Sequence, residues 1–303
     1  MMPTLRQIRY FIATANTGQV SQAAMDLNVS QSAITTSLKS LEEMLDTSLF
    51  TRHSQGMALT YEGNQFLQHA LYIMSAVEEA MRIPSRSHEK IVGKIRIAMS
   101  YTVAGYFAPP YLVRFQRSFP QVEIQLFEAQ REQIEEGLAS GQYDLAMMLT
   151  SNLVNQEDIA FEVLLSSRRR LWLGTNHPLR QKKHISLQDV AEEPYIMLAV
   201  DEASNTAQRY WNQTSYRPNV VFRTSSVEAV RSMVANGYGV SILSDMVYRP
   251  WSLEGRRVEV HTLEDSVPGM DVGIAWNKKK ELSSAEAAFC EFIRLTVVAG
   301  INS

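Results

Sequence analysis

Residues 21–45 read SQAAMDLNVSQSAITTSLKSLEEML, and this stretch predicts two short helices separated by a tight break. Ser30 suits the N-cap of the second helix, because its hydroxyl can accept a hydrogen bond from a free backbone N–H group. The second helix carries an apolar stripe in which Ile34, Leu38, Leu41 and Leu45 are spaced by four, three and four residues.

The opposite face of this second helix is polar and can both donate and accept hydrogen bonds. It carries Gln31, Ser32, Thr35, Thr36 and Lys39. A rigid helix pair that presents such side chains is what reading of the DNA major groove requires. The periodicity is equally compatible with any small three-helix domain that has a polar outer face, so both interpretations stay open at this point.

The segments on either side extend the pattern to a small domain with a wing. Residues 4–15 predict a helix that Thr4 caps and Gly18 ends. The sequence LFTRHSQGMALT at 49–60 predicts two short strands around a polar turn. Arg52 and His53 near this turn are candidates for contact with phosphate or the minor groove, and a solvated loop is the alternative.

A long helix is predicted from Tyr61 to about Ile83. Its apolar residues Phe66, Ala70, Ile73, Val77 and Ala80 follow a 3.5-residue repeat, which keeps one seam towards a partner helix. A helix that extends from a small domain cannot bury such a stripe alone, which favours a dimer. Packing onto its own chain is the alternative. The polar segment PSRSHEK at 84–90 predicts a hinge.

From residue 91 onward, strands alternate with helices, which predicts an α/β fold with mostly parallel sheets. So many strands in about 210 residues indicate two α/β lobes. We expect strands at 95–99, 122–128, 143–149, 171–174, 195–200, 219–224, 239–243, 257–263 and 272–276. We expect helices at 109–119, 131–140, 187–191, 206–213, 226–236 and 284–298.

The composition is that of an ordinary globular protein, with 303 residues, 45% hydrophobic and 20% charged residues, and a net charge of −3. Residues 1–60 carry as many cations as anions: Arg6, Arg9, Lys39 and Arg52 against Asp26, Glu42, Glu43 and Asp46. This balance argues weakly against nucleic acid as a partner, unless the cations cluster on one face and two heads act together.

Several classes of protein are not favoured. The sequence has no run of about 18 apolar residues and no signal peptide, so we expect neither a membrane span nor export. The single cysteine, Cys290, excludes an intramolecular disulfide and lies in the apolar segment AAFCEFI, which favours a buried, unreactive thiol and a cytoplasmic protein. The six histidines show no metal-ligand spacing, and no GxSxG, P-loop or GxGxxG motif occurs. We therefore expect no enzyme activity, metal or cofactor.

Taken together, the residues resemble the LysR-type bacterial transcriptional regulators. Residues 5–63 are similar to the winged helix-turn-helix of that family from end to end, and the most specific elements are Ser30-Gln31-Ser32-Ala33, Leu41-Glu42 and Leu49-Phe50 with Arg52. Similar pieces follow at LASGQYDLAM (138–147), His177-Pro178-Leu179 and SVEAVRSMVANGYGVSIL (226–243). Thr36 and Ser40 stand where family members often carry basic residues, so the recognition face is less basic than usual.

The resemblance implies a winged helix-turn-helix DNA-binding domain at 1–60 and a linker helix with a hinge at 61–90. A two-lobed α/β effector domain similar to periplasmic binding proteins follows at 91–303. Lobe I comprises about 91–163 and 267–303, lobe II comprises about 164–266, and the chain crosses near 163–166 and 266–271. It further implies a dimer that often pairs into a tetramer. The DNA contacts expected are Ser21, Gln22, Ser30, Gln31, Ser32, Thr35, Thr36, Lys39, Arg52 and His53.

A small-molecule site is expected where strands end and helices begin. Ser100, Tyr101 and Thr102 follow the strand at 95–99, and a helix N-terminus with hydroxyl groups suits an anion such as a carboxylate. The resemblance implies that the hydroxyl at Thr102 contacts the effector, with Ser100 as the second candidate. Helix capping is the alternative for such side chains.

Arg131 follows Gln130 after the strand at 122–128, and its guanidinium could pair with a carboxylate or phosphate of the effector. An i,i+4 ion pair with Glu135 is the alternative. The remaining candidates at the same strand-end edge are Thr150, Asn205, Thr206 and Ser226. The basic runs 168–170 and 278–280 are expected to be solvated.

We therefore expect a DNA-binding regulator controlled by a small, anionic effector. A ligand-binding protein whose N-terminal head serves only dimerisation is the second hypothesis, and an enzyme is a distant third.

Overall fold

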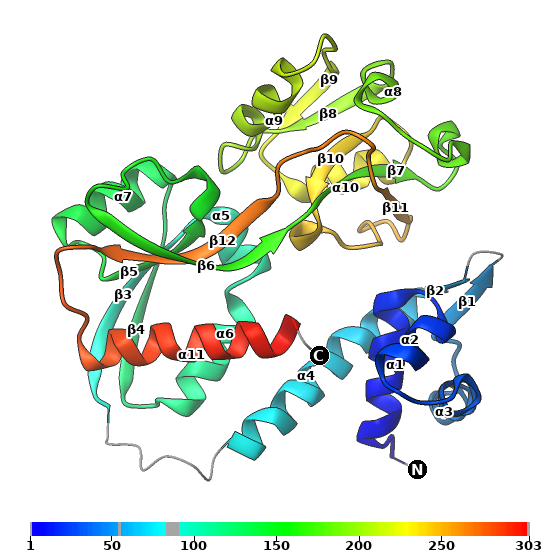
Figure 1. Cartoon of the computed structure of the whole chain (residues 1–303), viewed down its shortest axis with the longest axis horizontal. Helices are drawn as coiled ribbons and strands as arrows, with labels where there is room; N and C mark the ends of the chain where they lie inside the picture. Colours follow the sequence, from blue (N-terminus) through cyan, green and yellow to red (C-terminus); the bar gives the residue numbers. More distant parts are fainter. Residues whose placement is uncertain (1, 54–55, 83–90, 302–303) are drawn as a thin grey trace. The chain divides into compact units, whose positions relative to one another are not determined.

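The computed structural model describes residues 2–53, 56–82 and 91–301. They form two compact units, an N-terminal unit within residues 1–88 and a C-terminal unit within residues 89–302 (Figure 1). The hinge expected at 84–90 lies outside the described residues. No helix in the described part of the chain is long and apolar enough to cross a membrane.

The N-terminal unit contains helices and a two-stranded wing, as the sequence predicts. Its elements are α1 (Leu5–Thr17), α2 (Val20–Asp26), α3 (Gln31–Leu45), β1 (Phe50–His53), β2 (Gly56–Leu59) and α4 (Tyr61–Arg82). The predicted caps are confirmed. Thr4 forms a capping box with Gln7, Gly18 ends α1 in the left-handed conformation with φ 67°, and Ser30 accepts a hydrogen bond from the backbone N–H of Ala33 at 3.2 Å.

The core of the N-terminal unit forms where α1, α2 and α3 meet. Phe11 is fully buried, and its ring lies 5.2 Å from that of Phe50 and 4.9 Å from that of Phe66. Ile34, Leu38 and Leu41 of the predicted stripe are buried, whereas Leu45, the last residue of α3, is 36% exposed. The small side chains of Ala23 and Ala24 are buried in this core and let α2 and α3 approach closely.

A carboxylate fixes the wing against the helices. Glu42 accepts hydrogen bonds from the backbone N–H groups of Leu49, at 2.7 Å, and Phe50, at 3.1 Å. Thr60 then closes the wing, since its hydroxyl donates to the Ser48 carbonyl at 2.7 Å and accepts from the N–H of Gly63 at 2.9 Å. The turn residues that precede the first helical turn of α4 are thus held by charge-assisted and side-chain hydrogen bonds.

The predicted seam of α4 is shared between two roles. Ala70 is buried and Phe66 is half-buried against the core of the unit, so the first part of the seam packs on the same chain, as the alternative held. Leu71 and Ile73 are 40% and 36% exposed, so apolar surface remains on α4 for a partner. The side chain of Ala80, which was expected in the seam, lies outside the described residues.

Gly63 is the position where this packing is tightest. A Cβ atom there would lie 2.0 Å from the carbonyl oxygen of Leu49, whereas one at Gly105 in the C-terminal unit would meet nothing within 4 Å. We expect Gly63→Ala to destabilise the N-terminal unit by about 1–3 kcal/mol, because backbone must shift. Faster amide hydrogen exchange across residues 5–82 would report it. Gly105→Ala is the control, and equal exchange in the two variants would contradict the prediction.

The C-terminal unit contains ten strands and seven α-helices among its described residues. The strands are β3 (Gly93–Met99), β4 (Val122–Glu128), β5 (Leu145–Leu149), β6 (Ile159–Ser167), β7 (Arg169–Gly174), β8 (Pro194–Leu198), β9 (Asn219–Thr224), β10 (Ser241–Ser244), β11 (Val258–His261) and β12 (Met270–Asn277). The helices are α5 (Tyr101–Tyr106), α6 (Pro109–Ser118), α7 (Arg131–Ser140), α8 (Leu187–Ala191), α9 (Ala203–Asn212), α10 (Val227–Ala235) and α11 (Ser284–Ile301).

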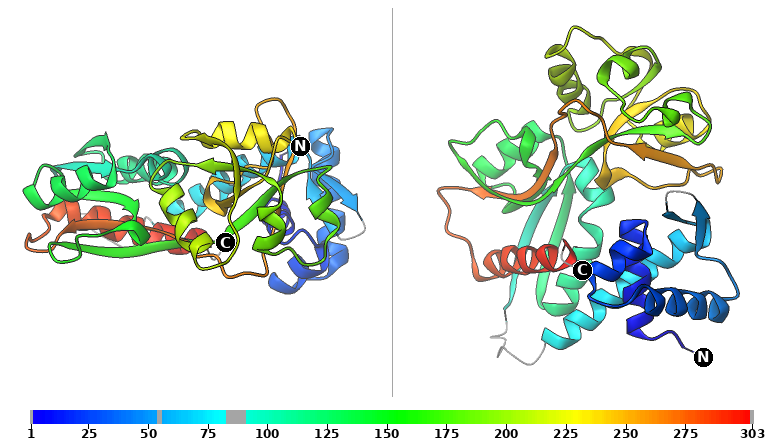
Figure 2. Two further views of the ribbon diagram at one scale, coloured as in Figure 1. Left: turned by 90° about the horizontal axis from the view of Figure 1, so that it is seen from above. Right: turned by 45° about the vertical axis from the view of Figure 1, so that its right-hand side comes forward.

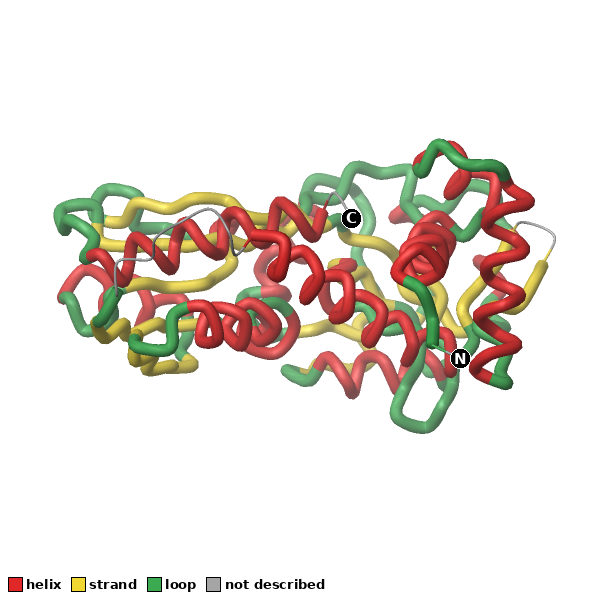
Figure 3. The backbone as a smooth tube through the Cα atoms, turned by 90° about the horizontal axis from the view of Figure 1, so that it is seen from below, coloured by secondary structure: helices red, strands yellow, loops and turns green. Residues whose placement is uncertain are grey.

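Lobe I is a five-stranded sheet with the order β4-β3-β5-β12-β6. Alternation along β3 sends Ile95, Ile97 and Met99 into the core beneath α6 and α11, and Ala98 into the core beneath α7. Helices therefore cover both faces of the sheet (Figure 3). The strand ends that lead into α5 and α7 consequently lie at one edge of the sheet.

Lobe II contains the antiparallel strands β10-β7-β11 and the parallel pair β8-β9, joined by a bridge between Tyr195 and Val240. The expectation of mostly parallel sheets is therefore wrong for this lobe. It is incomplete for lobe I, where β12 runs antiparallel to β5 and β6. The reason is topological, since β6 leads the chain into lobe II and β12 brings it back.

The crossing between the lobes is itself a strand pair, β6 with β12, which runs from one lobe into the other (Figure 2). β6 is not among the expected strands, and the crossing expected at 163–166 falls inside it. Apolar residues at every second position, Ile159, Phe161 and Val163, are the signal that the sequence offered for this strand.

Arg168 of the basic run 168–170 is exposed, whereas Arg169 and Arg170 are engaged and Arg169 fastens this crossing. Arg169 donates to the carbonyls of Pro268 and Gly269 on the returning segment, and Arg170 pairs with Asp245 at 2.6 Å. The lysines at 278–280 are likewise engaged, since Lys279 pairs with Asp158 at 2.7 Å and Lys280 with Asp144 at 3.0 Å. Lys278, Lys279 and Lys280 remain exposed, as expected, whereas the expectation of a solvated side chain is wrong for Arg169, which is partly buried against the returning segment.

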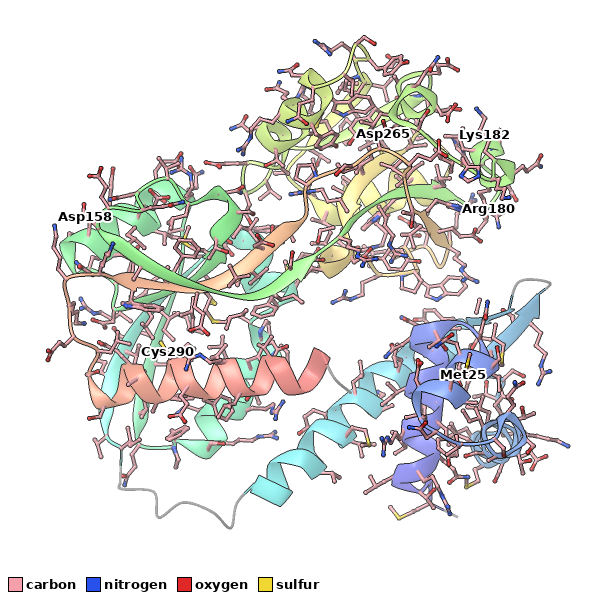
Figure 4. The ribbon with its side chains drawn as sticks, in the orientation of Figure 1. Met25, Asp158, Arg180, Lys182, Asp265 and Cys290 are labelled. Carbon is pink, nitrogen blue, oxygen red and sulfur yellow. The ribbon has the colours of Figure 1, made fainter. Side chains whose placement is uncertain are left out.

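Cys290 lies on the buried face of α11, whose neighbours Phe289 and Ile293 are fully buried in the lobe I core (Figure 4). Burial raises the pKa of its thiol to about 12. The predicted burial of this cysteine is confirmed, and the raised pKa favours the protonated thiol at neutral pH.

Asp144 is bonded to two cations, Arg96 of β3 and Lys280 in the segment before α11. Its carboxylate accepts from Arg96 at 2.8 Å and from Lys280 at 3.0 Å. Burial acts to raise the pKa of Asp144, but the hydrogen bonds from Arg96 and Lys280 outweigh it and lower the pKa to about 2, from an ordinary value of 3.8.

The depressed pKa predicts an acid-dependent contribution to stability. Above pH 3.8 the charged Asp144 stabilises the folded unit, and this contribution is lost as the pH falls to about 2. The shift corresponds to about 2 kcal/mol. We expect Asp144→Asn to flatten the decline of unfolding free energy across this window, measured by urea unfolding followed with tryptophan fluorescence. Glu136→Gln, which removes an exposed carboxylate of α7, is the control, and a decline as steep as in the wild type in the Asp144 variant would argue against this role.

Candidate functional site

The outer face of α3 presents the polar side chains that the sequence predicted. Gln31, Ser32, Thr35, Thr36 and Lys39 are exposed, while the apolar stripe of the same helix is buried. The Thr35 hydroxyl donates to the Gln31 carbonyl at 2.9 Å, which leaves its lone pairs facing outward. Lys39 lies 3.7 Å from Glu43, but both side chains are exposed, so this ion pair is weak.

The other expected DNA contacts differ in availability. Ser30 is engaged as the cap of α3, and Gln22 donates to Asp26 at 2.7 Å. Ser21 is half-buried, and Arg52 on β1 is exposed. The backbone of His53 belongs to β1, but its side chain lies outside the described residues.

Arg6 is a basic residue that the sequence reasoning did not select. It is exposed and lines a groove of about 660 Å³ between α1 and α3, together with Thr4, Ser32, Thr36 and Ser40. The groove places Arg6, one of the four cations of this neutral unit, beside the polar face of α3. Only the packing of α1 on α3 brings these positions together, because they are far apart in the sequence.

In the C-terminal unit a cavity of about 550 Å³ lies between the two lobes. Its walls come from the ends of strands and the starts of helices: Ser100, Tyr101, Glu128, Ala129, Gln130, Arg131, Glu132, Gln133, Met148, Leu149 and Asn152 from lobe I, and Ala199, Val200, Asp201, Glu202, Ser204, Asn205 and Ser225 from lobe II. This is the strand-end edge at which the sequence placed a ligand.

Four of the expected effector residues line this cavity, namely Ser100, Tyr101, Arg131 and Asn205. The other four are held elsewhere among the described residues. Thr150 donates to the Asp271 carbonyl at 3.4 Å, and Thr206 is buried and accepts from Arg209 at 3.4 Å. Ser226 caps α10 by accepting from the N–H of Ala229 at 3.1 Å, as the capping alternative predicted for such residues.

Thr102 is buried, and its backbone N–H donates to the Asp201 carboxylate at 2.6 Å. The free N–H group expected at the start of α5 is thus already bonded to a carboxylate of the same chain, contributed by lobe II. The carbonyl of Asp201 also accepts from the Asn152 amide at 3.0 Å. Two hydrogen bonds therefore tie this turn of lobe II to lobe I.

Arg131 is surrounded by carboxylates. Its Nε lies 2.5 Å from Glu202 of lobe II, one terminal nitrogen lies 3.1 Å from Glu135, and the other lies 2.6 Å from Glu132. Burial acts to lower the pKa of Arg131, but the hydrogen bonds to Glu202 and Glu135 raise it above its ordinary value. The Glu135 pair is the alternative considered from the sequence. Three of the five guanidinium N–H donors are bonded to carboxylates of the same chain, so the charge of Arg131 is largely neutralised before any effector binds.

Asp201 and Glu202 were missed by the sequence reasoning, although they directly follow the strand-end segment that precedes Asn205. Both adopt left-handed backbone conformations, with φ values of 47° and 60°. Such conformations cost on the order of 1 kcal/mol each for residues with side chains. The bonds to Thr102 and Arg131 across the cleft hold this turn in place.

The charges that line the cavity are predominantly negative. Four carboxylates, of Glu128, Glu132, Asp201 and Glu202, face one guanidinium, of Arg131, so the lining carries one minus four, or −3. Within the described residues, no group of three or more His, Cys, Asp or Glu side chains could hold a metal ion. The cavity is therefore acidic without being a metal site.

Comparison with known proteins connects both halves of the chain to one family. The family described as "Bacterial regulatory helix-turn-helix protein, lysR family" matches residues 5–64, and the family described as "LysR substrate binding domain" matches residues 88–297. These families comprise transcriptional regulators and not enzymes. The resemblance stated from the sequence, and the expected order of a helix-turn-helix domain and an α/β effector domain, are confirmed.

Individual proteins are similar along nearly the whole chain. YwqM of Bacillus subtilis, an uncharacterized helix-turn-helix-type transcriptional regulator, is 28% identical over 296 residues, which cover 96% of this chain and 99% of YwqM. The RuBisCO operon transcriptional regulator of Allochromatium vinosum is 28% identical and covers 97% of this chain and 96% of its own. The crystal structure of HinK, a LysR family transcriptional regulator from Pseudomonas aeruginosa, matches with a TM-score of 0.64 at 28% identity, over 98% of this chain and 99% of HinK.

The carboxylate cluster around Arg131 predicts a large effect on stability. Arg131→Ala leaves the buried Glu135 without its cation, and we expect the C-terminal unit to lose about 3 kcal/mol of unfolding free energy. Urea unfolding followed by tryptophan fluorescence measures this unit, because all four tryptophans belong to it. Lys94→Ala, which removes an exposed pair with Glu123, is the control and should cost less than about 1 kcal/mol. If both variants lose a similar amount of unfolding free energy, the Arg131 cluster stabilises the unit no more than an exposed ion pair does.

Proposed function

Since the chain belongs to the LysR family of transcriptional regulators, we propose that α3 reads operator DNA in the major groove. We further propose that a small molecule bound in the cavity between lobes I and II controls this binding. Gln31, Ser32, Thr35 and Thr36 contact base edges, while Lys39, Arg52 and Arg6 contact phosphates.

The observation that supports the DNA proposal best is the two-sided character of α3. Its apolar side is buried in the core with Ile34, Leu38 and Leu41, and its polar side is fully presented to solvent. A helix held rigidly from one side, with amide and hydroxyl groups on the other, has the geometry that groove reading requires. Because Ser30 is used as the cap of α3, the capped end of the helix is fixed as well.

The charge of the N-terminal unit makes self-association part of the proposal. Residues 1–60 carry four cations and four anions, so a single unit offers few phosphate contacts. Two units bound side by side double these contacts and fix the spacing of two half-sites. The exposed Leu71 and Ile73 on α4 supply apolar surface for a dimer, and pairs of dimers form a tetramer.

The cavity is proposed as the effector site because both lobes contribute to it. A ligand that touches Ser100 and Tyr101 of lobe I and Asn205 of lobe II binds the closed cleft better than an open one. Only such differential affinity can shift the populations of two conformations and so alter DNA binding.

The DNA proposal is tested by an electrophoretic mobility shift with DNA from upstream of the gene. We expect a sequence-specific, salt-sensitive complex with the full-length protein. Gln31→Ala and Thr35→Ala should each weaken it by about 1–3 kcal/mol per lost base contact and relax specificity at one position.

Gln181→Ala is the matched control, because Gln181 is an exposed amide in the C-terminal unit. If all three variants bind as the wild type does, the N-terminal unit serves dimerisation rather than recognition. Absence of any specific shift by the wild-type protein overturns the proposed function.

A further inference from the structure

We infer that the cavity between the lobes binds a small organic cation, an amine or a guanidine, whose charge is held between carboxylates of both lobes. This inference rests on the proposed function, in which the cavity is the effector site. It reverses the expectation of an anionic effector.

The distribution of charge across the cavity carries the inference. Lobe I contributes Glu128 and Glu132, and lobe II contributes Asp201 and Glu202. Arg131 alone compensates them, and its guanidinium already contacts Glu132, Glu202 and the buried Glu135. An anion entering this space would meet repulsion from several carboxylates, with no uncommitted cation on the cavity wall.

Two of these carboxylates have no cationic partner among the described residues. Asp201 accepts one backbone hydrogen bond, from Thr102, through a single oxygen. Glu128 is exposed at the end of β4, where its backbone pairs with β3, and its carboxylate makes no hydrogen bond within the described part of the chain. They come from opposite lobes, so a cation bound by both would join the lobes.

A second observation, independent of charge, also points to a ligand. Ser100 lines the cavity and is only 5% exposed, yet its hydroxyl oxygen has no hydrogen-bond partner and does not cap α5. A buried hydroxyl without a partner costs about 1–3 kcal/mol. An ammonium or guanidinium N–H group can donate to this oxygen, and in that way satisfies it.

The rest of the lining fits an organic cation better than a metal ion. The described carboxylates do not gather into a group able to hold a metal. Met148, Leu149, Ala199 and Val200 provide apolar wall next to the acidic groups, which suits a carbon chain. A charged end and an apolar body therefore both find matching surface.

The same charges explain how such a ligand would act on the lobes. Carboxylates that face each other from lobes I and II repel, and Arg131 offsets only part of this repulsion. A bound cation offsets the remainder and so favours the closed cleft. The position of the ligand and its effect on conformation thus follow from one electrostatic imbalance.

Titration calorimetry on the full-length protein tests the inference with three probes of the same chain length: putrescine (a dication), succinate (a dianion) and butanediol (uncharged). We expect putrescine to bind at millimolar concentrations or below, and the other two to show no heat of binding. Glu128→Gln and Asp201→Asn should each weaken putrescine by about tenfold, which corresponds to about 1.4 kcal/mol.

Glu136→Gln is the matched control, because Glu136 is an exposed carboxylate on α7 that does not line the cavity, and it should bind putrescine as the wild type does. The inference is overturned if putrescine does not bind, whether or not succinate does, or if all variants bind putrescine with equal affinity. It is also overturned if Mg²⁺ competes with putrescine for the cavity as well as putrescine itself binds. Mobility shifts on the same samples keep the two proposals apart. If the wild type binds DNA but not putrescine, only the inference of a cationic effector is rejected. If the wild type shows no specific DNA binding, the proposed function is rejected.

Discussion

The contacts between Arg131 and three carboxylates are the interaction on which the C-terminal unit depends most. Glu132 and Glu135 come from the same helix, α7, but Glu202 comes from lobe II, so a single guanidinium links both lobes at the mouth of the cavity. Glu135 also accepts from the N–H groups of Val154 and Asn155, which fastens the segment leading to β6. The cleft is therefore held by charge as well as by the covalent crossing of β6 and β12.

This arrangement places two opposing tendencies in one site. The starts of α5, α7 and α9 reach the cavity, and helix N-termini favour negative charge. The chain itself supplies that charge, since Asp201 bonds to the N–H of Thr102 and Glu202 precedes α9. Carboxylates remain in excess after this internal neutralisation. The charge of an incoming ligand is therefore selected by these carboxylates rather than by the helix N-termini.

The N-terminal unit presents polar groups on a small surface that carries almost no net charge. The cap at Ser30, the carboxylate of Glu42 and the close contact at Gly63 fix α3 and the wing without adding cations. Positive charge is instead brought in from α1, where Arg6 lies beside the polar face of α3. Rigidity and position, rather than net charge, therefore define this surface.

The sequence by itself determined the helix-turn-helix, its caps, the exposed face of α3 and the order of the two units. These features follow from local periodicity and from side chains that bond within a few residues. It also located the edge at which the cavity forms, because strand ends and helix starts are local as well. Tertiary structure alone decided that the charge lining the cavity is negative and that Arg131 pairs with Glu202. It also decided the antiparallel return of β12 and the packing of Phe66 onto its own unit. Each of these depends on residues distant in the sequence, such as Arg131 with Glu202, whose pairing no local pattern encodes.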